Sequence, residues 1–124
     1  MLKVTSTPNA PAAIGPYSQA VSVNGLLFTS GQVALMPGTG EIVGTIIEEQ
    51  AEQVCKNLEA ILKENGIGFE NVVKTTCFLA DMNDFAKFNE VYGKYFVGKP
   101  ARSCVAVKTL PKNLLCEVEV IAEL

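Results

Sequence analysis

The dipeptide Asn24-Gly25 lies between two short runs rich in β-forming residues, at positions 20–23 and 26–29. This dipeptide suits a type I′ turn, in which both central residues take positive φ, and such a turn joins adjacent antiparallel strands. The sequence therefore predicts a β-hairpin over residues 20–29. Residues 1–18 contain Pro8, Pro11 and Pro16, a composition that disfavours helix and predicts an ordered or semi-extended arm.

Two helices are predicted from the spacing of apolar residues. Positions 47, 51, 54, 58 and 61 are apolar and share one helical face, which predicts a helix over residues 46–64. Thr45 and Glu48 have the spacing of a capping box at its start, and Asn65-Gly66 supplies a stop signal. A second helix is predicted before Gly98, with an aromatic face interpreted as core packing. That face consists of Phe85, Phe88, Tyr92 and Tyr95.

Three further strands complete the predicted sheet. Residues 72–79 are rich in β-branched side chains and predict a central strand, while residues 101–108 and 114–123 flank a turn-like segment at 110–113. The order β-β-α-β-α-β-β predicts an α+β fold in which two helices pack on one face of a mixed sheet. The length of 124 residues suits one domain, so we expect a single domain over residues 1–124.

The composition argues against several classes of function. No apolar run approaches the roughly 20 residues of a membrane span, and the N-terminal residues lack the apolar segment of a signal peptide, so we expect a cytosolic protein. The formal net charge is -3 and the lysines are scattered, which disfavours nucleic-acid binding. The four cysteines form no Cys-x-x-Cys pair, and the chain has no histidine, so a structural metal site is not expected. Cys55, Cys77 and Cys116 are interpreted as small buried apolar groups.

Arg102 is the only arginine in this chain without histidine. The chain therefore lacks the commonest general base and the usual middle member of nucleophilic triads, so its chemistry must depend on carboxylates, thiols, hydroxyls, backbone dipoles or Arg102. A guanidinium grips a carboxylate through two parallel hydrogen bonds, which the ammonium of lysine cannot do. Arg102 is thus a candidate anchor for a carboxylate ligand, with a structural salt bridge as the alternative.

Alternation along the strands predicts which side chains share a face. Arg102 and Cys104 point the same way, and Glu117 and Glu119 lie together on one face of the last strand. If the two C-terminal strands pair around the 110–113 turn, all of these side chains share a face. For Cys104 burial is the default interpretation, although a nearby guanidinium would lower the pKa of its thiol. Glu117 and Glu119 are either solvated or salt-bridging groups, or a carboxylate tuned to position or deprotonate water.

The face with the glutamates is also expected to carry apolar side chains. Leu115 and Ile121 belong to it by alternation. Leu27 and Thr29 of the hairpin are expected there too, and two helices cannot cover both sides of the sheet. An exposed apolar patch of this size is unusual in a soluble protein. We therefore expect a homo-oligomer whose subunits bury these faces against one another, with sites at the seams.

Several short motifs follow one another along the chain between about residues 8 and 122. They are Gly15-Pro-Tyr-Ser-Gln-Ala20, Ser30-Gly31-Gln32, the strand at 72–79 with Asp81-Met82, Asn89-Glu-Val-Tyr92, Pro100-Ala-Arg-Ser-Cys104, and Leu110-Pro111 followed by Glu117-Val-Glu119. In this order and spacing they resemble the reactive-intermediate imine deaminase family, RidA, also called YjgF. The resemblance implies a chorismate-mutase-like α+β subunit that assembles into a homotrimer.

The resemblance further implies hydrolysis of small enamine and imine acids to 2-oxo acids and ammonia, with no cofactor or metal. The substrates would be 2-aminoacrylate and its imine 2-iminopropanoate, or 2-iminobutanoate, which are released by pyridoxal-phosphate enzymes acting on serine or threonine. Arg102 would hold the substrate carboxylate, Glu117 would orient the attacking water, and Cys104 would contribute backbone groups beside the imine nitrogen. The site would lie between subunits, with Tyr17, Ser30 and Gly31 lining it and Asn89 nearby.

This chemistry agrees with the residues available. A protonated imine is already electrophilic, so the protein mainly has to fix the substrate and place a water, which requires no histidine. Two alternatives stay open: a non-catalytic protein that binds small carboxylate metabolites, and an RNA-cleaving translation inhibitor, an activity attributed to some relatives. The net negative charge and the single arginine argue against the second.

Overall fold

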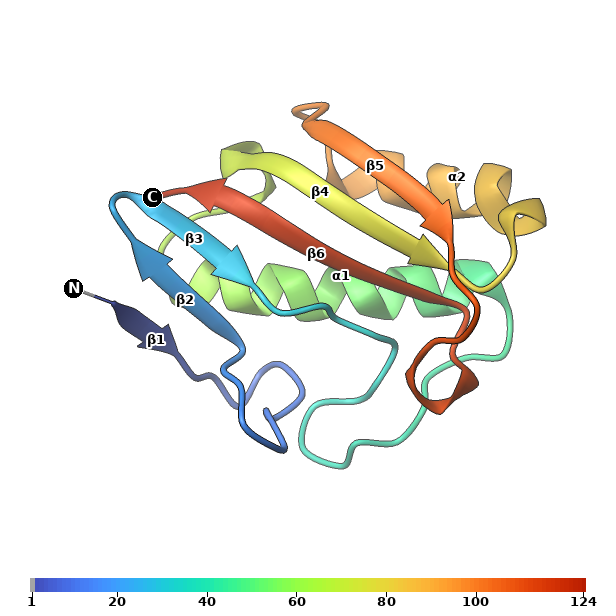
Figure 1. Cartoon of the computed structure of the whole chain (residues 1–124), viewed down its shortest axis with the longest axis horizontal. Coiled ribbons are helices and arrows are strands. Elements are labelled where there is room, and N and C mark those ends of the chain that lie inside the picture. The colour runs from blue at the N-terminus through green and yellow to red at the C-terminus, as the bar shows by residue number, and fades with distance from the viewer. Residues whose placement is uncertain (1) are drawn as a thin grey trace.

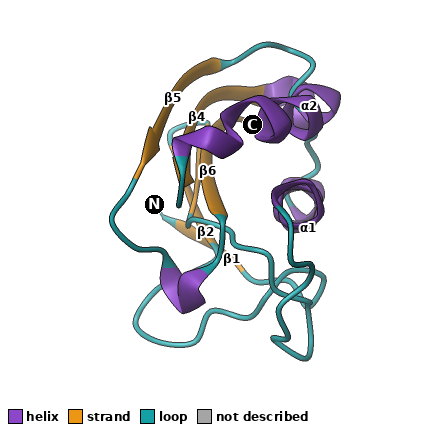
Figure 2. Cartoon of the chain, turned by 90° about the vertical axis from the view of Figure 1, so that its right-hand side faces the viewer, coloured by secondary structure: helices purple, strands orange, loops and turns teal. Residues whose placement is uncertain are grey.

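Both helices pack on one face of a six-stranded mixed sheet, as Figure 2 shows. The computed structural model describes residues 2–124. The strands are β1 (Lys3–Thr5), β2 (Ala20–Val23), β3 (Leu26–Thr29), β4 (Val72–Leu79), β5 (Ala101–Ala106) and β6 (Cys116–Glu123), and the helices are α1 (Ile47–Glu64) and α2 (Phe85–Tyr95). Their order across the sheet is β1-β2-β3-β6-β4-β5 (Figure 1). The predicted α+β class with two helices on one face is confirmed.

The N-terminal part of the sheet contains the predicted hairpin and one strand more. Asn24 has φ of 52° and Gly25 has φ of 80°, the positive values that a type I′ turn requires, so the hairpin is confirmed. The expected arm is partly wrong, because Lys3–Thr5 pairs with β2 as strand β1. Three residues are too few to show the alternation that identifies a strand in sequence.

Helix α1 begins one residue later than predicted and is capped differently. Ile46 occupies the N-cap position and makes no side-chain capping hydrogen bond. The backbone N–H of Thr45 donates to Oε1 of Glu49 at 3.0 Å, so the predicted capping box with Glu48 is wrong. The predicted end of the helix is confirmed by Gly66, which follows the C-cap residue with φ of 74°.

Strand β5 pairs with β4 and not with β6. Helix α2 connects β4 to β5, and a helical crossover of this kind joins parallel neighbours. Strand β6 then lies antiparallel to β4 on its other side. The expected pairing of the two C-terminal strands around the 110–113 turn is therefore wrong, because the chain passes from one side of β4 to the other between them.

This topology places Arg102 and Glu117 on opposite faces of the sheet. The register partner of Arg102 is Thr75, which is fully buried beneath the helices. The register partner of Glu117 is Phe78, three positions further along β4 and so on the other face. Arg102 and Cys104 share a face as predicted, but it is the helix-covered face, whereas the glutamates lie on the open one.

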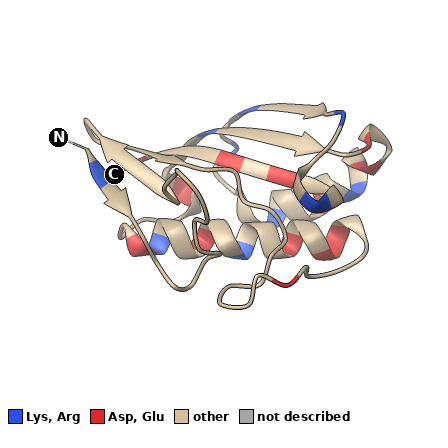
Figure 3. Cartoon of the chain, turned by 60° about the horizontal axis from the view of Figure 1, so that its bottom comes forward, with Lys and Arg blue, Asp and Glu red and all other residues tan. Residues whose placement is uncertain are grey.

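The core fills the space between the helices and the sheet. Val54, Leu58 and Ile61 of α1 meet Val118 and Val120 of β6, and none of these side chains is more than 2% exposed. Figure 3 shows acidic and basic positions interspersed along α1, as expected of a helix with one solvated face. Within residues 2–124 no helix combines the length and the apolar character needed to cross a membrane.

The open face is apolar, but through different hairpin residues from those predicted. Leu27 pairs with Ala122 and is fully buried on the core side. The expectation that Leu27 and its same-face neighbour Thr29 lie on the open face is therefore wrong, because the alternation of this strand is shifted by one residue from the predicted one. Phe28 occupies the open face instead, paired with Ile121 and 39% exposed. Leu115 precedes β6 and packs against the core, so its expected place on the open face is also wrong.

Candidate functional site

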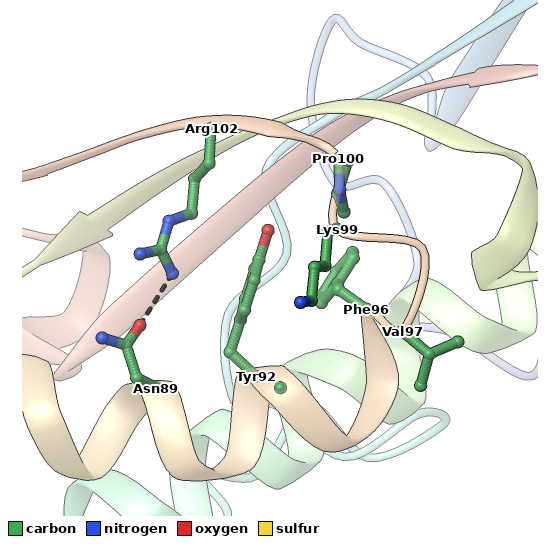
Figure 4. Close-up of a pocket in the computed structure, with 8 residues that line it drawn as sticks. Asn89, Tyr92, Phe96, Val97, Lys99, Pro100 and Arg102 are labelled. Carbon is green, nitrogen blue, oxygen red and sulfur yellow. Dashed lines mark hydrogen bonds between the residues drawn. The ribbon is translucent and has the colours of Figure 1, made fainter.

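Arg102 projects from β5 toward α2 and is held there by uncharged groups. One Nη donates a hydrogen bond to Oδ1 of Asn89 at 2.7 Å, and the guanidinium carbon lies 4.7 Å from the ring centre of Tyr92 and 5.3 Å from that of Phe85. Figure 4 shows this arrangement. Its partners within residues 2–124 are thus an amide oxygen and two aromatic rings, and none of them is a carboxylate. Most of its five N–H donors are left for a ligand.

The ring of Tyr92 is held by a hydrogen bond at its hydroxyl and by a stacking contact with a second ring. Its hydroxyl and that of buried Thr75 are 2.7 Å apart in a hydrogen bond, and burial raises the pKa of Tyr92. Phe96 stacks on the ring with 4.2 Å between ring centres. The prediction that the aromatic face packs in the core holds for Tyr92. Its contact with the guanidinium of Arg102 was not predicted from sequence.

Cys104 lies on the same face as Arg102, next to the core. It is half-buried, and its register partner on β4 is the fully buried Cys77. Burial raises the pKa of the Cys104 thiol, and the charge of Arg102 opposes that rise without outweighing it. The guanidinium therefore does not produce a thiolate here, and Cys104 has no nucleophilic character that the geometry favours.

A pocket of about 340 Å³ opens beside Arg102, between α2 and the start of β5. Asn89 and Tyr92 line it from α2, and Phe96, Lys99, Pro100 and Arg102 line it from the segment that follows (Figure 4). Sequence analysis did not identify Lys99, although it directly precedes the Pro100-Ala-Arg motif.

Glu117 lines a second and larger pocket of about 740 Å³, on the opposite side of the sheet from Arg102. Two hydrogen bonds between the backbones of Gln32 and Val118, of 2.8 and 3.1 Å, hold Gly31 next to Glu117. A Cβ atom on Gly31 would lie 2.8 Å from Cδ of Glu117, so a side chain at this position would displace the carboxyl group. Gly31 and Glu117, both expected near the site, therefore lie in direct contact.

The wall of the second pocket is built by a network around Gln19. Oγ of Ser30 donates to the backbone oxygen of Ser18 at 2.6 Å, and the N–H of Ser30 donates to that of Gln19 at 2.9 Å. The buried amide of Gln19 accepts from the N–H of Thr7 at 2.7 Å and donates to the backbone oxygens of Thr7, Ala10 and Pro11. Tyr17, 54% exposed, lines the same pocket. The supporting role of Gln19 behind this wall was not predicted from sequence.

The surroundings of Glu117 in this second pocket favour its neutral, protonated form over its charged form. Burial raises the pKa of Glu117, and the negative charge of Glu119 adds to the rise. A carboxylate with a raised pKa binds a proton more readily at working pH than an ordinary glutamate does. Within residues 2–124 no group of three or more His, Cys, Asp or Glu side chains is placed to hold a metal ion.

The predicted site residues therefore form two groups in one chain. Arg102, Asn89 and Cys104 gather on the helix-covered side of β5, while Glu117, Gly31, Ser30 and Tyr17 surround the second pocket. The two groups share no pocket, and the sheet separates Arg102 from Glu117.

Comparisons with known proteins agree on one family. The family model described as "Endoribonuclease L-PSP" matches residues 7–124. The 2-iminobutanoate/2-iminopropanoate deaminase of Mus musculus is 54% identical over 121 residues, which cover 97% of this chain and 90% of that protein. Reactive Intermediate Deaminase A, chloroplastic, of Arabidopsis thaliana is 51% identical over 98% of this chain and 66% of its own length. The crystal structure of E. coli TdcF with bound serine has a TM-score of 0.93, with 42% identity and 98% of each chain covered.

Proposed function

The chain belongs to the RidA/YjgF family, and from this premise we propose that it hydrolyses small imine and enamine acids to 2-oxo acids and ammonia. The observation that supports this most directly is Arg102, whose guanidinium is held by Asn89 and aromatic rings with no carboxylate among its partners within residues 2–124. Every substrate of this class carries a carboxylate that a guanidinium binds well. The proposed substrates are 2-aminoacrylate with its imine 2-iminopropanoate, and 2-iminobutanoate.

The proposed reaction needs an anchor and a placed water. A protonated imine, RC(=NH₂⁺)COO⁻, takes up H₂O and gives RC(=O)COO⁻ and NH₄⁺. Arg102 holds the carboxylate, while Glu117 accepts the proton of the attacking water and returns it to the departing nitrogen. The raised pKa of Glu117 suits this exchange, because a carboxylate whose pKa lies above its ordinary value is a stronger proton acceptor. Positioning and electrostatics supply the rate enhancement, and no cofactor is required.

The other predicted residues shape the site in this proposal. Asn89 orients the guanidinium of Arg102, and the backbone of Cys104 lies beside the imine nitrogen. Gly31 leaves room for the carboxyl group of Glu117, because a Cβ there would displace it. Tyr17 and Ser30 form the wall opposite Glu117 in the larger pocket.

We propose that the complete site forms between two copies of the chain in a homotrimer. The Arg102 pocket and the Glu117 pocket lie on opposite sides of the sheet, so no single chain can bring both to one substrate. Docking the Glu117 pocket of one subunit against the β5 edge of the next completes the site. The same docking covers the apolar open face, where Phe28 and Val105 are 39% and 48% exposed.

The test is a coupled assay in which a serine dehydratase generates 2-aminoacrylate and the release of pyruvate or ammonia is followed. The intact protein is expected to accelerate release, and Arg102→Ala is expected to abolish the acceleration while light scattering shows the oligomer intact. Lys94→Ala is the matched control, since it removes an exposed cation near the end of α2 outside both pockets. Full activity of Arg102→Ala contradicts the role of Arg102, and no acceleration by the intact protein contradicts the proposed function.

A non-catalytic role in binding small carboxylate metabolites is the alternative, because the same guanidinium would serve it. Saturable binding of 2-oxobutanoate without turnover of any imine would favour that role. RNA cleavage is disfavoured by charge. The formal net charge is -3, and Figure 3 shows acidic and basic positions mixed over the described residues.

A further inference from the structure

A second cation, Lys99, lines the pocket that contains Arg102. In Figure 4 its side chain extends from the loop after α2 toward Phe96, and it lies on the other side of Tyr92 from Arg102. The loop holds this position, because the N–H of Lys99 donates to the backbone oxygen of Phe96 at 3.2 Å. Lys99 has φ of 51° directly before Pro100, a left-handed conformation that lysine rarely adopts.

The lining of this pocket contains no negative charge to balance the two cations. Apart from Lys99 and Arg102, the lining residues are all uncharged, and they include Asn89, Tyr92 and Phe96. An anion that enters the pocket therefore meets two positive groups on low-dielectric aromatic walls, which strengthens the attraction. The volume of about 340 Å³ is in the range of small-molecule sites, about 300–1,000 Å³.

The space in this pocket is not needed for packing within the chain. Gly93 lines it from α2, and a Cβ atom built on Gly93 would meet nothing within 4 Å. Glycine inside a helix is less favourable than alanine, so helix stability does not explain its presence. The open surface at Gly93 leaves room for a ligand that reaches from Arg102 toward Lys99.

We propose that Lys99 is a second anion subsite, and that the site therefore binds dicarboxylic ligands, the imines of acidic amino acids and their 2-oxo acids, more tightly than monocarboxylic ones. The planar fork of Arg102 suits the carboxylate next to the imine carbon. The compact ammonium of Lys99, on a flexible stem, suits a side-chain carboxylate whose position changes with chain length. The imine chemistry rests on the proposed function, but the subsite itself is tested by binding alone.

The experiment measures the dissociation constants of 2-oxoglutarate and 2-oxobutanoate by calorimetry at low salt. The intact protein is expected to bind 2-oxoglutarate more tightly by a factor of up to about five, the upper end of the range for a solvent-exposed ion pair. Lys99→Gln is expected to remove this preference, and Lys94→Gln, a lysine of the same helix end outside the pocket, to keep it. Added salt is expected to reduce the preference in the intact protein.

Each outcome separates this inference from the proposed function. An unchanged ratio of the two dissociation constants in Lys99→Gln overturns the subsite, and so does equal binding of the two acids by the intact protein. Arg102→Ala is expected to weaken both acids. If it weakens neither, the carboxylate anchor of the proposed function fails instead. Turnover of 2-iminopropanoate without tighter binding of dicarboxylates supports the proposed function and contradicts the subsite.

Discussion

The contact between Gly31 and Glu117 gives the sharpest test of the proposed water-placing group. A Cβ atom on Gly31 would lie 2.8 Å from Cδ and 3.0 Å from Cγ of Glu117, and still closer to one carboxylate oxygen. The backbone of Gly31 is pinned by the neighbouring bridge between Gln32 and Val118, so it cannot move away easily. In Gly31→Ala the side chain of Glu117 must therefore leave its position.

The cost to stability is expected to be small. A side chain forced away from its preferred rotamer costs about 0.5–1.5 kcal/mol, and overpacking in general costs about 1–3 kcal/mol. Gly31 is not among the residues with positive φ, so alanine fits the backbone and stabilises by about 0.4–1 kcal/mol through the unfolded chain. The difference predicts a net change between a gain of about 0.5 kcal/mol and a loss of about 2.6 kcal/mol. The loss in activity is expected to be larger, about a hundredfold, because a positioned base contributes about 10²–10⁴ in rate.

The assay compares kcat/KM for imine hydrolysis with the free energy of unfolding in urea at a fixed protomer concentration. Gly98→Ala is the matched control, because its Cβ would have only the backbone oxygen of Glu70 nearby, at 4.0 Å. The double variant Gly31→Ala/Glu117→Gln is expected to be no less active than Glu117→Gln alone, since both changes remove the same function. Normal activity of Gly31→Ala, or additive losses in the double variant, would refute the argument.

Three other predictions concern the charges around the site. Glu119→Gln is expected to move the acid limb of kcat/KM to lower pH, because the charge of Glu119 contributes to the raised pKa of Glu117; an unmoved limb contradicts this. Because the pKa of Glu117 is higher in the folded than in the unfolded protein, the free energy of unfolding falls as pH rises from 4.5 through the folded pKa. Glu117→Gln lacks this loss, so it is expected to be more stable than the parent above this pH window in urea titrations. Asn89→Asp is expected to raise KM more than Asn89→Ala does, because an aspartate 2.7 Å from Arg102 competes with the substrate carboxylate, and steady-state kinetics would show the order.

Local signals in the sequence predicted most of the elements. The Asn24-Gly25 turn, the apolar spacing of α1 and the β-branched run of β4 each depend on residues close together in the chain, and each was confirmed. The errors came from features that local patterns do not contain. Strand β1 has only three residues, and the partner of β5 depends on which side of β4 the chain returns to after the crossover.

The candidate site could be predicted as a set of residues but not as a geometry. The motifs named Arg102, Asn89 and Glu117, and alternation correctly placed Arg102 with Cys104. The single wrong pairing of β5 then put Glu117 on the same face as Arg102. That Lys99 lines the Arg102 pocket and that Gln19 supports the wall of the other pocket were missed for a different reason, because an exposed lysine and a buried amide have no distinguishing pattern in one sequence.

The separation of Arg102 from Glu117 by the sheet fits the roles proposed for the two groups. On one face of one chain they would pair, and the guanidinium would be neutralised before a substrate arrived. Such a pair would also lower the pKa of Glu117, whereas burial and Glu119 raise it in the structure. With the sheet between them, the guanidinium keeps its donors for a carboxylate and the glutamate keeps its affinity for a proton. In the proposed reaction, a second chain brings the carboxylate anchor and the base to the same substrate.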